Sequence, residues 1–219
     1  MKIYFACPTG ERRDKIVEKY GDIFGACLTR DVFNKTTAKK MSWFFDNGAF
    51  SDWKTNKRFD FHKFTVRLLH IEANSRFKGY KRPDFVVIPD KVAKGEHSLE
   101  YSNLWLPYLN HNFPYFDYYL AVQDDMETWM VEKYIRRRYY DGLFVGGTKK
   151  WKYENSEKWV KLAHKYGLKC HIGGIGTRKS ILWAKSIGAD SVDSGVAMIH
   201  PVHLKEVLNI HNDLFWNIA

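Results

Sequence analysis

The chain has 219 residues, of which 45% are hydrophobic, and its formal net charge is +10 at pH 7. This length suits one domain, the hydrophobic content excludes general disorder, and no apolar run is long enough to span a bilayer. The basic charge favours a polyanionic partner such as nucleic acid, although it also fits a merely basic enzyme.

Cysteine usage and the N-terminal residues indicate the compartment. The three cysteines are dispersed and form no CxxC pair, so a structural zinc site has little support. The first residues read as a strand and lack the apolar segment of a secretory signal. We therefore expect a cytoplasmic protein, in the host cytoplasm if the protein is viral.

Short apolar segments rich in β-branched and aromatic residues predict strands. They lie at residues 2–6, 23–28, 43–46, 85–89, 118–122, 143–146, 169–172 and 191–193. Amphipathic segments predict helices at residues 11–20, 62–74, 99–106, 127–140, 156–166, 178–186 and 203–217. The interval 29–41 is short for a full crossover helix. This alternation predicts an α/β fold, a compact (β/α)8 TIM-like barrel, with residues 1–219 as a single domain.

Polar and glycine residues follow the predicted strands, at the barrel face where active sites form. They are Asp46, Asp90, Gln123, Gly146, Gly147 and Asp193. A lone Asp after a strand usually caps the next helix, and paired glycines usually only make a turn. Three Asp and one Gln on the same rim nevertheless predict a site. By contrast, we expect His171, within a strand, to be a packed residue.

These residue types suit the cleavage of a glycosidic bond. Without a metal-binding cluster the carboxylates must act directly, one as a nucleophile and another as a general acid/base. Carboxylate and amide groups also match the hydrogen-bonding edge of a purine. Glycine backbone permits close approach to a flat ligand, and Phe50 is placed to cover a ring face.

Six segments resemble, in order, motifs of the tRNA-guanine transglycosylases and their DNA-modifying relatives. They are Asp46-Asn47-Gly48-Ala49-Phe50, Ile88-Pro89-Asp90, Val122-Gln123, Leu143-Phe144-Val145-Gly146-Gly147, His171-Ile172-Gly173-Gly174-Ile175-Gly176-Thr177 and Gly188-Ala189-Asp190-Ser191-Val192-Asp193. Members of this family are (β/α)8 barrels that exchange guanine in a nucleic acid for a 7-deazaguanine. The resemblance implies that Asp193 is the nucleophile and Asp46 the general acid/base. It implies base contacts from Asp90, Gln123, the backbone of Gly146 and Gly147, and the ring of Phe50.

The resemblance also implies partners. No organic cofactor is expected, and the second substrate would be a free 7-deazaguanine base such as preQ0 or a relative. The family's Cys-x-Cys-x-x-Cys zinc motif is missing, so no zinc subdomain is expected, and no room remains for an appended RNA-binding domain. Gly173 replaces a stacking Met, and Asp124 replaces a Gly. DNA, as in the small phage and bacterial DNA-modifying branch, is therefore favoured over tRNA, and no membrane is expected.

Two basic, aromatic segments are predicted as loops on the same rim. The first carries Trp53, Lys54, Lys57 and Arg58, and the second carries Lys149, Lys150, Trp151, Lys152 and Tyr153. Lysines would meet phosphates, aromatic rings would stack on unpaired bases, and a base in a duplex would have to flip out. The alternative is two solvated loops, with Trp53 and Trp151 packing each loop onto the barrel.

Two other functions remain open. The segment Gly173-Gly174-Ile175-Gly176-Thr177 before a helix resembles the phosphate site of many barrels, which would suit FMN or a sugar phosphate. That function leaves the three Asp residues unexplained. A non-catalytic nucleic-acid-binding barrel would bind without base exchange and tolerate Asp193→Ala.

Overall fold

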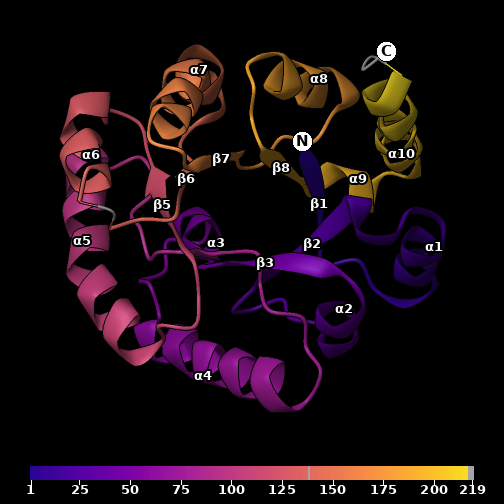
Figure 1. The fold of residues 1–219 in the computed structure, drawn as a ribbon, viewed down its shortest axis with the longest axis horizontal. Helices are drawn as coiled ribbons and strands as arrows, with labels where there is room; N and C mark the ends of the chain where they lie inside the picture. The colour runs from indigo at the N-terminus through magenta and orange to yellow at the C-terminus, as the bar shows by residue number, and fades with distance from the viewer. Residues whose placement is uncertain (138, 217–219) are drawn as a thin grey trace.

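The protein is an eight-stranded parallel barrel surrounded by helices, in a computed structural model that describes residues 1–137 and 139–216 (Figure 1). The strands pair in chain order, and β8 pairs with β1 to close the barrel. The strands are β1 (Lys2–Ala6), β2 (Phe24–Thr29), β3 (Ser42–Asp46), β4 (Val86–Val87), β5 (Tyr118–Val122), β6 (Gly142–Val145), β7 (Lys169–Ile172) and β8 (Ser191–Ser194). The predicted (β/α)8 barrel is therefore confirmed.

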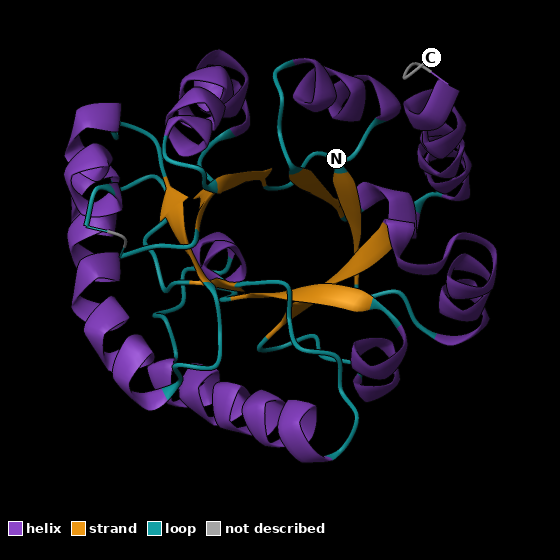
Figure 2. Ribbon diagram, viewed as in Figure 1, coloured by secondary structure: helices purple, strands orange, loops and turns teal. Residues whose placement is uncertain are grey.

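Most helices form a ring outside the strands (Figure 2). They are α1 (Gly10–Tyr20), η1 (Gly21–Ile23), α2 (Lys35–Lys40), α3 (Ala49–Lys54), α4 (Phe61–Phe77), α5 (Gly95–Asn112), α6 (Thr128–Ile135), α7 (Lys149–Lys165), α8 (Arg178–Ser186), α9 (Val196–Ile199) and α10 (Pro201–Trp216). In Figure 1, α3 is seen within this ring. Among the described residues, no helix combines the length and the apolar character that a bilayer span requires.

Several helix boundaries differ from the sequence prediction. Helix α5 begins four residues before and ends six residues after the predicted 99–106. Helix α6 ends at Ile135, five residues before the predicted end, and α7 begins at Lys149, seven residues before the predicted start. The first turns of α7 are mostly polar and exposed, so apolar periodicity could not reveal them. The helix predicted for 203–217 corresponds to α10, and its residue 217 lies outside the described residues.

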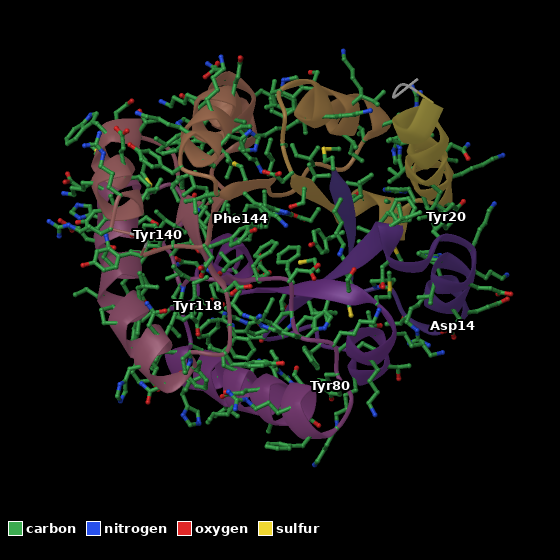
Figure 3. All side chains as sticks on the ribbon, in the orientation of Figure 1. Asp14, Tyr20, Tyr80, Tyr118, Tyr140 and Phe144 are labelled. Carbon is green, nitrogen blue, oxygen red and sulfur yellow. The ribbon has the colours of Figure 1, made fainter. Side chains whose placement is uncertain are left out.

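Aromatic side chains fill the inside of the barrel. Phe85 stacks between Phe44 and Tyr119, with ring centroids 4.6 and 3.9 Å away, and Tyr4 meets Phe44 edge-on at 4.9 Å. Phe144 lies near the centre of the barrel in Figure 3, 6.2 Å from Phe44 between ring centroids. A larger apolar cluster packs the strands against the helices. Because the interior is filled, polar residues that follow the strands gather above it, at the barrel mouth.

Candidate active site

A cavity of about 150 Å³ lies at the carboxyl ends of the strands. Its lining comes from the ends of β3 to β8 and from α3 and α7, and consists of Asp46, Asn47, Phe50, Val87, Asp90, Val92, Gln123, Phe144, Gly146, Gly147, Lys152, Gly173, Gly174 and Asp193. All seven residues predicted as catalytic or base-contacting are among them. A cavity of roughly this volume holds a benzene-sized ring.

Asp46 ends β3 and accepts a hydrogen bond from the backbone N–H of Gly48 at 2.7 Å. Burial, reinforced by the negative charges of Asp193 and Asp90, raises the pKa of Asp46 to about 7. The hydrogen bond from Gly48 opposes this shift without cancelling it. The carboxyl group can therefore gain or lose a proton near neutral pH, as a general acid/base requires.

Asp90 is 6% exposed and is held by two amide side chains. Its Oδ1 accepts from Asn47 Nδ2 at 2.7 Å, and its Oδ2 accepts from Gln123 Nε2 at 2.6 Å. Burial raises the pKa of Asp90 to about 6, although both hydrogen bonds favour the ionised form. Each carboxylate oxygen keeps a further lone pair with which to accept a hydrogen bond from a ligand.

Asn47 is a site residue that the sequence analysis missed. Its Nδ2 also donates to the Ile88 carbonyl at 2.7 Å, and its Oδ1 accepts from the Ala49 N–H at 2.7 Å. All three contacts fix the orientation of the amide, so that a donor faces Asp90. Its position beside Asp46 at a strand end was the available signal, but Asn in a turn has many other uses.

Asp193 lies in β8 and is held by neutral donors. His171 Nε2 is 3.0 Å from Asp193 Oδ1, and the Gly174 N–H donates to the same oxygen at 2.9 Å. Burial lowers the pKa of His171, so the imidazole is neutral at pH 7. The bond to a carboxylate assigns the ring proton to Nε2, and Nδ1 then accepts from Ser191 Oγ at 2.8 Å. His171 is thus packed, as predicted, and also orients Asp193.

The two predicted rim loops are largely helical, which corrects the prediction: Trp53 and Lys54 lie in α3, and Lys149, Lys150, Trp151, Lys152 and Tyr153 lie in α7. Lys152 lines the cavity. It belongs to α7, and its Nζ donates to the Gly173 carbonyl at 2.6 Å. The N–H of this same peptide unit, on Gly174, donates to Asp193. The ammonium therefore polarises the peptide in the direction that strengthens its bond to the carboxylate. Burial lowers the pKa of Lys152, although Asp193 and Asp124 oppose that shift.

The glycine pair after β6 makes room for its neighbours. A Cβ on Gly146 would lie 2.5 Å from Gln123 Nε2, and one on Gly147 would lie 2.5 Å from Asp124 Oδ2. Gly147 also has a φ of +76°, which disfavours other residues. Asp124 accepts from the N–H and hydroxyl of Thr148, at 2.8 and 2.5 Å, and so secures the start of α7.

The predicted basic and aromatic rim is only partly exposed. Phe50 is 50% exposed at the cavity, with the Lys54 ammonium 5.0 Å from its ring centroid. Side chains exposed to solvent are those of Trp53, Lys54, Lys57, Arg58, Lys149, Lys150 and Tyr153. Trp151 is half-buried against the apolar core, 6.4 Å from Trp159 between ring centroids, and packs the start of α7 onto the barrel. Trp151 therefore fits the packing alternative better than base stacking.

The described residues contain no group of three or more His, Cys, Asp or Glu side chains arranged to hold a metal ion. In the comparisons with known proteins, no family model matches the chain and no curated protein matches it.

The raised pKa of Asp46 makes a prediction about stability. Between the unfolded pKa near ~3.9 and the folded pKa of about 7, the folded protein retains a proton that the unfolded chain releases. The free energy of unfolding therefore falls as pH rises through this window. Relative to wild type, Asp46→Asn should gain roughly 2–3 kcal/mol of stability between pH 5 and pH 8, as measured by urea unfolding.

Asp90→Asn provides a matched comparison, because its advantage should develop at lower pH, below the folded pKa of about 6. A difference between Asp46→Asn and wild type that stays constant from pH 5 to pH 8 would contradict the raised pKa of Asp46.

Proposed function

We propose that this barrel replaces guanine in DNA with a 7-deazaguanine base, through a covalent bond between Asp193 and deoxyribose. The observation that carries the proposal is the gathering of Asp46, Asp90, Gln123 and Asp193 in one cavity of ring size. The order of motifs along the chain, similar to that of the guanine transglycosylases, supports the same reaction. Action on tRNA and binding without catalysis are the alternatives that the experiments below separate.

Base recognition in this proposal uses Asp90 and its neighbours. An ionised Asp90 accepts hydrogen bonds from the ring N–H and the exocyclic amine of guanine. Gly146 and Gly147 line the cavity, but the Gly146 N–H already donates to the Val122 carbonyl at 2.9 Å. We therefore assign the backbone donor to the guanine oxygen to the Gly147 N–H. Gln123 and Asn47 keep Asp90 oriented, while apolar contacts come from Phe50, Val87, Val92 and Phe144.

The first chemical step forms the covalent intermediate. A carboxylate oxygen of Asp193 attacks C1′, the C1′–N9 bond breaks, and the electron pair leaves with guanine. Protonated Asp46 donates its proton to the departing base. Both described donors to Asp193, His171 and the Gly174 N–H, bond to Oδ1, so Oδ2 is the oxygen that we assign to the attack.

The second step reverses the first with a different base. The incoming 7-deazaguanine gives its ring N–H proton to the Asp46 carboxylate, and this nitrogen attacks C1′. The bond between C1′ and Asp193 breaks, which restores the free carboxylate. Protons and electrons balance over the two steps, so the exchange requires no cofactor.

The phosphate-ligand alternative has less support at the glycine-rich segment. The Gly174 N–H is already bonded to Asp193, and a Cβ on Gly176 would lie 2.9 Å from Val196 Cβ, so this glycine packs against α9. Thr177 and Ser180 form a capping box at the start of α8 and satisfy two of the N–H groups that a phosphate would use. A flavin absorption spectrum of the purified protein would support this alternative.

Loss of the nucleophile gives the central test. The protein is incubated separately with guanine-containing DNA and with tRNA, each with labelled guanine or a labelled 7-deazaguanine base. Asp193→Asn retains size and hydrogen bonding but lacks the attacking anion, so it should abolish exchange and the covalent protein–DNA adduct while polymer binding persists. Near-normal exchange by this variant would eliminate the mechanism. Label that enters neither polymer with the wild-type protein would count against the function.

Two pKa values predict the pH dependence of exchange. Hydrogen bonding to guanine requires ionised Asp90, which predominates above about pH 6. Departure of the base requires protonated Asp46, which predominates below about pH 7. The kcat/KM for the polymer should therefore follow a narrow bell with its maximum between these values. Asp46→Asn should slow exchange by roughly 10²–10⁴ and remove the alkaline limb. An alkaline limb that persists in this variant would assign the proton to another group.

Salt dependence tests the polymer partner. The affinity for DNA should fall steeply with salt, because exposed lysines release counterions from phosphates. Replacing Lys149 and Lys150 together by Ala should make the negative slope of log affinity against log salt shallower by about 1–2. The matched control replaces Lys161 and Lys165, at the other end of α7, and should leave the slope near that of wild type. Equal effects of the two pairs would contradict binding at the barrel mouth.

A further inference from the structure

A second cavity, of about 380 Å³, opens beside the first. It lies between the segment around α3 and the loop that joins β4 to α5, and its lining is Ala49, Asp52, Trp53, Lys57, Arg58, Phe59, Asp90, Lys91, Val92, Lys94 and Tyr101. Asp90 and Val92 line both cavities. A ligand that extends from the first cavity can therefore continue directly into the second.

The second cavity is cationic. Lys57, Arg58, Lys91 and Lys94 line it with exposed side chains. Its two carboxylates are already satisfied within the protein, because Asp52 pairs with the buried guanidinium of Arg30 and Asp90 accepts from two amides. The basic groups are thus available to an anionic ligand.

An aromatic surface connects the two cavities. Trp53 is 48% exposed in the second cavity, and its ring centroid lies 5.7 Å from that of Phe50, which lines the first cavity. Phe59 and Tyr101 add two half-buried rings, and the Lys91 ammonium lies 4.8 Å from the Tyr101 centroid. Exposed rings beside cations are the pattern with which proteins bind single-stranded nucleic acid.

We propose that the second cavity binds the nucleotide next to the guanine being exchanged. Its base stacks on Trp53, and the phosphate that links it to the target nucleotide meets the cations of the cavity. The inference rests on the proposed function in one respect, that the substrate is a polymer. The first cavity also has aromatic rings and one ammonium, but that ammonium, of Lys152, is bonded to the Gly173 carbonyl, whereas the four basic side chains of the second cavity are exposed. Because the two cavities lie side by side, recognition involves one neighbour of the target, on one side only.

Abasic substitution tests this asymmetry. Single-stranded DNAs with one guanine carry an abasic nucleotide either just before or just after it. An abasic nucleotide that removes one stacked base should decrease kcat/KM by about 5- to 150-fold. We expect this decrease for the abasic nucleotide on one side of the guanine and not for the one on the other side. Trp53→Ala should impose a similar decrease on the intact strand and add little to the abasic one, because both changes remove the same contact. Trp53→Phe should restore most of the loss.

Matched surface variants control for non-specific effects. Phe77→Ala removes an exposed aromatic ring at the C-terminal end of α4, on the side of the barrel where β4 begins and away from the two cavities. This variant should retain the one-sided dependence. Lys91→Ala with Lys94→Ala should weaken DNA binding more than Lys39→Ala with Lys78→Ala, which removes equal charge from the exposed ends of α2 and α4. Equal decreases on the two sides, no decrease, or one-sided dependence that survives in Trp53→Ala would overturn the proposal.

A binding assay separates this proposal from the chemistry. Fluorescence anisotropy of the same labelled strands measures affinity without any exchange. One-sided dependence of affinity with no exchange would support the second cavity and overturn the base-exchange function. Exchange without one-sided dependence would overturn the second cavity alone.

Discussion

The site depends on placing three carboxylates at one barrel mouth, where no Lys or Arg among the described residues forms a direct ion pair with them. Charged groups removed from water must be neutralised, paired or hydrogen-bonded. Here the donors to Asp46, Asp90 and Asp193 are backbone N–H groups, side-chain amides and a neutral imidazole. These neutral donors leave carboxylate oxygens able to accept hydrogen bonds from a ligand that presents N–H donors, while the Lys152 ammonium that also lines the cavity donates to the Gly173 carbonyl.

The packing below the mouth makes this arrangement possible. The stacked rings of Phe44, Phe85 and Tyr119 fill the barrel interior, and Phe144 stacks on His171 with ring centroids 4.8 Å apart. A Cβ on Gly173 would lie 2.5 Å from Phe144 Cζ, so this position must be small for the Phe144 ring to occupy its place. Gly173, Phe144 and His171 thus form one packed layer beneath the cavity.

The sequence predicted the barrel and most of the cavity because both depend on local patterns. Apolar segments of strand length identified all eight strands, and the positions just after them included Asp46, Asp90, Gln123 and Asp193. Lys152 could not be placed from the pattern, because its inward direction depends on α7 beginning at Lys149 and on a carbonyl 21 residues away. Asn47 and the second cavity likewise depend on contacts between segments that are distant in sequence.

The different environments of Asp46 and Asp193 assign them different roles in the proposed exchange. Asp193 has two donors on one oxygen, whereas Asp46 has one backbone donor and a pKa raised to about 7 by burial and by neighbouring carboxylates. When Asp193 forms its bond to C1′ it loses its negative charge, and Asp46 gains one by giving up its proton. The total charge of the pair is therefore unchanged through the step. Ester formation also removes the negative charge of Asp193, one of the contributions beside burial that raise the pKa of Asp46, and this favours the newly formed Asp46 carboxylate. This compensation lets proton transfer accompany bond cleavage without a change in the total charge of the two carboxyl groups.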